Sequence, residues 1–298
     1  MWVIDTFGAE VRQVVVSADG RVLAALFADH TVVVWDWGGG ERWRAACPGG
    51  VRLALSPDGE WLAACGPDAL RVWPAGGGPA VEFRSAPRAA FVGGVAFTPD
   101  GKYLVASRDK STTADHYLLA GPGQLARWSV PGWQPAPGFD DHWPLFPRLA
   151  VSPDGDYVAG IGPRGCELRF ARSGGKQGWV RVPGGGGHTH LAFAPDSRTL
   201  VCGWDAGLHV MDTGSGRETR PALRAGRPVR DVAYTGDGRH VGTVDGTALL
   251  RLWDAGAWVV DREFDWAAGP LTALAFTADG VAGVCGTGGG QLVLFDLD

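Results

Sequence analysis

Apolar residues recur along the chain in short alternating runs, and seven of these runs lead into a polar turn of the form Ser/Thr/Ala-x-Asp-Gly or a close variant. The turn aspartates are Asp19, Asp58, Asp100, Asp154, Asp196, Asp237 and Asp279. Subtraction of successive positions gives spacings of 39, 42, 54, 42, 41 and 42. A period near 42 that recurs in phase indicates a repeat architecture rather than two ordinary globular domains.

Each turn predicts a β-hairpin, because an Asp-Gly step permits the positive φ of a tight turn between alternating apolar runs. The residues five and three positions before the turn Asp are apolar in every repeat. The residue between them is Ala in six repeats and Val15 in the first. Large side chains on one face and a small one on the other predict the innermost strand of a propeller blade, where space tapers.

A second apolar strand and then a third follow each turn. The third strand ends in Trp, Phe or Met, at an offset of 15 or 16 from the turn Asp in six repeats and of 28 in the third. The surplus of about twelve residues lies at 108–122, between the predicted second and third strands.

This pattern resembles the WD-repeat (Trp-Asp repeat) β-propeller family. The seven turns carry the resemblance, together with Trp35-Asp36, Trp253-Asp254 and the degenerate Met211-Asp212 and Phe295-Asp296. The resemblance implies an all-β, seven-bladed β-propeller of four-stranded antiparallel blades, with residues 1–298 as one domain. The chain is identified as a divergent bacterial-type member of that family.

Closure of the ring is expected to use the N-terminal segment. Residues 1–8 precede the first inner strand, while the last repeat has only three strands. We expect residues 2–7 to pair with residues 291–296 as the outer strand of the last blade, which would protect an otherwise open sheet edge.

Family members often contain a buried Asp–His–Ser/Thr–Trp hydrogen-bond network in each blade. In this sequence the position of the Asp is filled only by Asp29 and Asp205, and neither repeat has the upstream His. The blades are therefore expected to depend on apolar burial.

Composition narrows the function classes. The net charge of −5 argues against a general nucleic-acid binder, and no apolar run is long enough to span a membrane as a helix. No signal peptide is recognisable, and the five cysteines lack metal-site spacing. We expect a cytoplasmic, monomeric propeller that binds neither nucleic acid nor membrane.

No catalytic constellation is apparent, and we expect no enzyme activity, no cofactor and no metal. The glycine runs lack the ending of a phosphate loop, and the GxSxG motif of serine hydrolases is absent. His188 and His190 are interpreted as a solvated loop pair. Cys65, Cys202 and Cys285 are interpreted as buried strand residues rather than nucleophiles.

The resemblance places the residues nine and seven before each turn Asp at the mouth of the top face, where partners of the family often bind. A mouth containing Arg12, Phe91, Leu145, Trp204 and Arg230 would suit a peptide with one acidic and one apolar residue, with Trp204 in a loop between second and third strands as an anchor. The blade 3 insertion adds Arg108, Lys110, His116 and Tyr117, and the linker after that blade adds His142 and Trp143. Long loops on a rigid scaffold often carry function.

The sequence therefore favours a non-enzymatic scaffold that binds a protein or peptide through the top face and the blade 3 insertion. One alternative is a propeller enzyme or a binder of a small ligand or metal, with Asp109, Asp115, His116, Asp140 and His142 converging at the top rim of blades 3 and 4. Another is a regulatory module for a separately encoded signalling protein. The 24 Arg against 3 Lys fit a GC-rich bacterial coding bias, and some bacterial relatives are fused to kinases, but no kinase motif is present.

Overall fold

The hairpin at the start of each repeat is held by local hydrogen bonds. In the first repeat, the Ser17 hydroxyl donates to Asp19 Oδ1 (2.6 Å) and accepts from the amide of Val22 (2.9 Å), while Gly20 adopts a φ of 69°. A Ser or Thr binds the turn Asp in the same way in every repeat except the fifth. There Ala194 replaces the hydroxyl residue and Ser197 takes the glycine position, with a φ of 62°.

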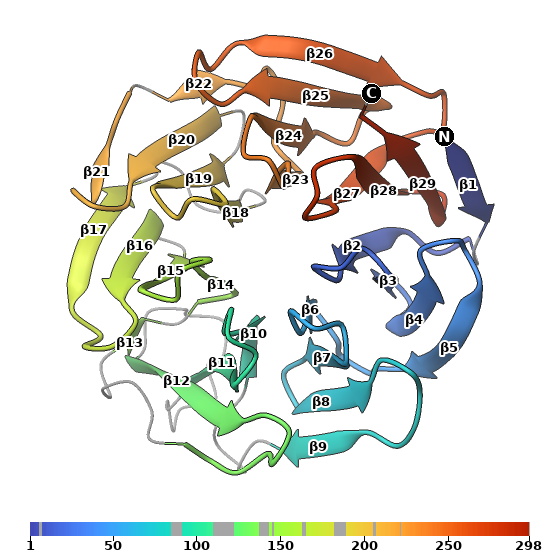
Figure 1. The fold of residues 1–298 in the computed structure, drawn as a ribbon, viewed down its shortest axis with the longest axis vertical. Coiled ribbons are helices and arrows are strands. Elements are labelled where there is room, and N and C mark those ends of the chain that lie inside the picture. Colours follow the sequence, from blue (N-terminus) through green and yellow to red (C-terminus); the bar gives the residue numbers. More distant parts are fainter. Residues whose placement is uncertain are drawn as a thin grey trace.

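These hairpins are the inner parts of seven antiparallel sheets arranged as a ring in the computed structural model (Figure 1). The structure describes residues 1–5, 8–84, 91–109, 122–136, 143–144, 146–162, 165–181, 189–204, 207–220 and 222–297. The innermost strands are β2 (Val11–Val16), β6 (Arg52–Leu55), β10 (Phe91–Phe97), β14 (Arg148–Val151), β18 (Thr189–Phe193), β23 (Asp231–Tyr234) and β27 (Leu271–Phe276). The fold predicted from the sequence, an all-β seven-bladed propeller, is confirmed.

Each innermost strand pairs with a second strand, and the second with a third. The second strands are β3 (Val22–Phe27), β7 (Trp61–Cys65), β11 (Tyr103–Asp109), β15 (Tyr157–Gly162), β19 (Thr199–Trp204), β24 (His240–Val244) and β28 (Ala282–Thr287). The third strands are β4 (Thr31–Asp36), β8 (Ala69–Pro74), β12 (Pro122–Ser129), β16 (Gly165–Phe170), β20 (Gly207–Asp212), β25 (Leu249–Asp254) and β29 (Gln291–Asp296).

The outer strands lie at the rim of the ring. They are β5 (Glu41–Ala46), β9 (Val81–Arg84), β13 (Trp143–Pro144), β17 (Lys176–Arg181), β26 (Val260–Asp265) and, in blade 5, the two short strands β21 (Arg217–Glu218) and β22 (Leu223–Arg224). The last blade is completed by β1 (Trp2–Asp5), which pairs with β29 from Trp2↔Leu294 to Asp5↔Gln291. The predicted closure is confirmed for residues 2–5, whereas residues 6 and 7 lie outside the described residues.

The hydrophobic core lies between the blades. Within the described residues, seven apolar clusters each join two neighbouring blades, and together they run round the whole ring. The tryptophans that end third strands belong to these clusters, as predicted: Trp35, Trp73, Trp128 and Trp253 are 2–7% exposed. Packing is close enough that a Cβ at Gly160 would lie 2.1 Å from the ring of Phe146. Apolar burial between sheets thus occurs at every blade boundary.

One element of the family network survives in blade 6. Trp253 Nε1 donates a hydrogen bond to Thr243 Oγ1 at 3.0 Å, and both residues are buried. This pair was not predicted from the sequence.

Cys65, Cys202 and Cys285 lie on second strands and are at most 1% exposed, as predicted. Burial raises the pKa of the Cys65 thiol to about 12 and raises that of Cys285 as well. These thiols are packing groups, because thiolate is the reactive form of cysteine.

The two faces of the ring carry different strand connections. We call the face with the seven Asp-containing hairpins the turn face, and the face where second strands connect to third strands the loop face. On the loop face, residues 110–121 separate β11 from β12, whereas the same connection takes only two to four residues in every other blade. The insertion predicted for blade 3 therefore lies where expected, although residues 110–121 themselves are outside the described part.

Candidate functional site in the central channel

The inner strands enclose two cavities on the axis of the ring. The small residue four positions before the turn Asp lines the cavity nearer the turn face, about 400 Å³ in volume, in five blades: Ala54, Ala96, Ala150, Ala233 and Ala275. Side chains two residues earlier lie on the same face of each strand, one step nearer the loop face. These line a second cavity of about 190 Å³, to which all seven inner strands contribute.

Five residues at this second level are polar or charged, and we call them the polar ring: Gln13, Arg52, Arg148, His190 and Asp231. They come from five different blades, and each lies six positions before its turn Asp. The corresponding residues of blades 3 and 7 are Gly94, which also lines the cavity, and Ala273, which is buried in the apolar cluster between blades 7 and 1. Five blades therefore contribute a polar or charged side chain to a single layer across the channel.

Hydrogen bonds run through the polar ring from blade 4 to blade 7. Arg148 Nη2 donates to His190 Nε2 at 2.8 Å. His190 Nδ1 lies 2.6 Å from Asp231 Oδ1, and Asp231 Oδ2 accepts from the amide of Leu274 at 2.9 Å. Because an arginine can only donate, His190 Nε2 must be the acceptor and Nδ1 must carry the proton given to Asp231. His190 is therefore neutral in this arrangement.

The other side of the polar ring is bound less completely. Gln13 makes two hydrogen bonds to the backbone of Leu53 in the next blade, 2.8 and 3.1 Å long. Arg52 Nη1 donates to the carbonyl of Val51, but its buried Nε has no hydrogen-bond partner among the described residues. An unsatisfied buried donor is costly in a folded protein.

The electrostatic balance of the polar ring is positive. Burial, and next the charge of Arg52, lower the pKa of Arg148 to about 9, so Arg148 is protonated at neutral pH. Arg52 also counts as a cation, because a guanidinium is effectively always charged in proteins. Burial alone would raise the pKa of Asp231, but His190, Arg148 and the Leu274 amide bring it below its usual value. With His190 neutral, two cations face one carboxylate. Burial lowers the pKa of Arg52, and the positive charge of Arg12, which is exposed on the adjoining part of β2, lowers it further.

His190 should make stability depend on pH. Burial, and then the positive charge of Arg148, lower its pKa to about 3, whereas a histidine in the unfolded chain titrates near 6.5. Between these values the unfolded chain binds a proton that the folded chain excludes. The contribution of His190 to the free energy of unfolding is therefore fully present above pH 6.5, and it is lost progressively as the pH decreases through this window.

At pH 5 we expect a loss of about 2 kcal/mol relative to pH 7, at ~1.4 kcal/mol per pH unit below 6.5. The measurement is urea unfolding of the wild type and of His190→Gln at both pH values. A glutamine amide can still accept from Arg148 and donate to Asp231, yet it does not titrate. Equal pH dependence in the two proteins would contradict this assignment.

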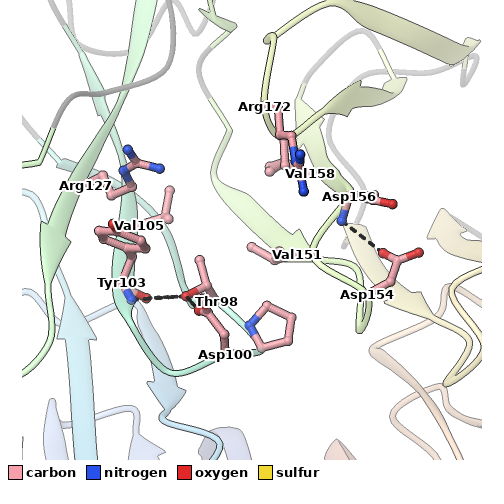
Figure 2. A pocket seen from close by; sticks show the side chains of 13 residues that line it. Thr98, Asp100, Tyr103, Val105, Arg127, Val151, Asp154, Asp156, Val158 and Arg172 are labelled. Atoms are coloured by element: carbon pink, nitrogen blue, oxygen red, sulfur yellow. Dashed lines mark hydrogen bonds between the residues drawn. The ribbon is translucent and has the colours of Figure 1, made fainter.

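A third cavity, of about 450 Å³, lies between blades 3 and 4 on the turn face (Figure 2). Thr98, Asp100, Tyr103 and Arg127 face Asp154, Asp156 and Arg172 across it. The guanidinium of Arg127 lies 4.4 Å from the centre of the Tyr103 ring.

A groove of the same kind, about 690 Å³ in volume, recurs between blades 5 and 6. Equivalent turn residues line it, including Asp196 and Asp237 in place of Asp100 and Asp154. A hollow that recurs with the repeat is a property of blade packing. The polar ring, in contrast, occurs once.

The partner-binding residues predicted from the sequence fall into three groups. Arg12 is exposed at the loop-face end of β2, and Arg230 is half-buried just before β23. For Phe91, Arg108, Trp143 and Trp204 the structure describes the backbone only. Lys110, His116, Tyr117, His142 and Leu145 lie outside the described residues.

The residues that directly follow the insertion lie at one edge with two residues of the next linker. Pro122 and Gly123, the first residues after the insertion, pair with Pro144 and Trp143 of the linker. The expectation that the linker reaches the same rim is thus confirmed for Trp143 and Pro144. The placement of Trp204 in a loop was wrong: it is the last residue of β19 and pairs with both Thr189 and Gly207.

The polar ring was not predicted from the sequence, and the interpretation of His190 from the sequence was a solvated loop residue. That interpretation was wrong, since His190 is on β18 and only 4% exposed. The polar ring could have been predicted by aligning the seven repeats. The polar residues six positions before the turn Asp lie on the same strand face as the small residue four positions before it, and that residue lines the channel. His188, the other member of that predicted loop pair, lies outside the described residues.

Among the residues that the structure describes, no three His, Cys, Asp or Glu side chains are placed to hold a metal ion. Of the alternative blade 3/4 site, Asp115, His116, Asp140 and His142 are not described, and Asp109 is described only in its backbone. In the described part of the chain, no helix is long and apolar enough to span a membrane.

Comparison with known proteins agrees with this architecture. A family model described as "WD domain, G-beta repeat" matches residues 3–36 and 82–112. An uncharacterised WD repeat-containing protein of Synechocystis sp. (strain ATCC 27184 / PCC 6803 / Kazusa) is 31% identical over 147 residues, which are 47% of this chain and 37% of that protein. The chain thus matches well under two thirds of that relative's length. Together with the closed ring of seven blades, these matches support the assignment of the chain to the WD-repeat β-propeller family.

Proposed function

We propose that the protein is a non-enzymatic scaffold that binds a protein or peptide through the loop face. The observation that carries the proposal is the asymmetry of blade 3. Its second-to-third-strand connection runs over 110–121 and its third-to-outer connection over 130–142, and the sheet joins their ends through Pro122–Pro144 and Gly123–Trp143. Long connections that begin or end at one edge of a rigid scaffold often carry recognition.

Charge supports an acidic partner segment. Arg12 is exposed on the loop face beside the channel, and the polar ring below it carries a net positive charge. Complementary charge of this kind accelerates association with an acidic peptide. The five free cysteines are in keeping with a reducing, cytoplasmic setting.

Shortening the insertion tests this proposal. Residues 110–121 are replaced by Asp-Gly-Thr-Ala, the residues that join β24 to β25 in blade 6. The fold should persist, because that connection already spans the same two strands in another blade. The variant and the wild type are used as baits in the source organism, and co-purifying proteins are quantified by mass spectrometry.

We expect recovery of the partner to fall at least tenfold in the shortened variant and to be preserved in Arg239→Glu, which changes an 82% exposed side chain on the turn face. Both variants should melt within a few degrees of the wild type. Equal recovery with the shortened variant would exclude the insertion as a binding element.

A further inference from the structure

We propose that the polar ring is a binding site for a single oxyanion group, either carboxylate or phosphate, within the central channel. This proposal does not depend on the proposed scaffold function. The bound group can be a free anion or an anionic side chain of a partner, because both offer the same chemistry. Its ligands are the guanidinium groups of Arg52 and Arg148.

Charge is the first argument. Arg52 and Arg148 line one cavity together with Asp231, and the hydrogen bonds of His190 leave that histidine neutral. Asp231 has both oxygens engaged, by His190 and the amide of Val232 on one and the amide of Leu274 on the other. Both oxygens of the Asp231 carboxylate thus bind groups of blades 5, 6 and 7. The polar ring contains two arginines and only one carboxylate, so one of its two positive charges has no counter-charge within the ring.

Unsatisfied donors are the second argument. Arg52 Nε is buried without a partner among the described residues, although the side chain lines the cavity. Arginine has five N–H donors in a planar fork that matches the two oxygens of a carboxylate or phosphate. An oxyanion beside Arg52 would both satisfy that donor and balance the charge.

Size is the third argument. The cavity of about 190 Å³ is roughly 13 to 19 times the ~10–15 Å³ that one water needs, and smaller than the ~300–1,000 Å³ of sites for drug-sized ligands. It therefore fits one anionic group rather than a whole cofactor. The exposed Arg12 places a further positive charge beside the channel, which favours the approach of an anion.

Isothermal titration at constant ionic strength tests the proposal. The probes are inorganic phosphate and acetate, with sodium chloride as reference, and two capped peptides, acetyl-Gly-Asp-Gly-amide and acetyl-Gly-phosphoSer-Gly-amide. The variants are Arg52→Gln and Asp231→Asn, and Arg84→Gln is the matched control because Arg84 is exposed on the outer strand β9.

We expect saturable binding of at least one probe by the wild type and by Arg84→Gln, at least tenfold weaker binding by Arg52→Gln, and tighter binding by Asp231→Asn, which lacks the competing carboxylate charge. Binding of the free ions identifies a small-molecule source, and binding of the peptides alone identifies a partner side chain. The absence of saturable binding with every probe, or unchanged affinity in Arg52→Gln, would overturn the proposal. Thermal melting of each variant establishes that a lost signal is not a lost fold.

Discussion

Replacing Asp231 by Ala is expected to lower the free energy of unfolding by about 3–5 kcal/mol, the range for leaving a buried charge, here that of Arg52 and Arg148, without its counter-charge. The Asp231 side chain is 14% exposed, and that of its partner His190 is 5% exposed. The substitution would leave Arg52 and Arg148 in the channel without any carboxylate. It would also remove the acceptor of the Leu274 amide and so the contact between blades 6 and 7 at this level.

Urea unfolding at pH 7 measures the effect. The matched control is Asp261→Ala, because Asp261 also pairs with a histidine, His240, at 3.2 Å, but is 44% exposed. Exposed pairs contribute about 0–1 kcal/mol, so the control should remain close to the wild type. If the two substitutions cost the same, the polar ring would have no special stabilising role.

Deletion of residues 1–5 should open the ring. The deletion removes the four paired positions between β1 and β29, and also the Gln291–Asp5 hydrogen bond of 2.7 Å. At ~1 kcal/mol net for each backbone hydrogen bond, a loss of roughly 3 kcal/mol is expected. The exposed β29 edge would also be open to pairing with a second chain, because its unpaired backbone groups and apolar sequence favour edge-to-edge association.

Urea unfolding and size-exclusion chromatography report the two effects separately. Val3→Thr is the control: Val3 is 43% exposed, and threonine keeps both the backbone pairing and the branched shape. It should be monodisperse and nearly as stable as the full chain. A truncated chain that unfolded and eluted like the intact one would refute closure by β1 as a stabilising contact.

The fold could be predicted because its signals are local and repeated. The Asp-Gly turns specify the inner hairpins through hydrogen bonds within five residues, such as those of Ser17 with Asp19 and Val22. Ring closure could be predicted because the last repeat supplies only three strands and the N-terminal segment precedes the first inner strand. The burial of Trp35 and Trp253 followed from their phase in the repeat.

The site could be predicted only in part, because it depends on side chains from distant repeats. His190 and Asp231 are 41 residues apart and meet only because the ring places blade 5 beside blade 6. Neither His190 nor Arg148 belongs to a motif, so each could be recognised only by comparing the same position in all seven repeats. Trp204 was misplaced because the connection from β19 to β20 is only two residues long, which leaves Trp204 in the strand.

The contacts between inner strands have a consequence for cooperativity. Gln13 bonds to Leu53, Arg148 to His190, His190 to Asp231, Asp231 to Leu274, and Thr272 to Val11. These hydrogen bonds cross five blade boundaries, including the one where the ring closes. A linear solenoid can fray from its terminal repeats, because each end has only one neighbour. In a closed ring every blade has two neighbours, and no blade can loosen without breaking contacts on both of its sides.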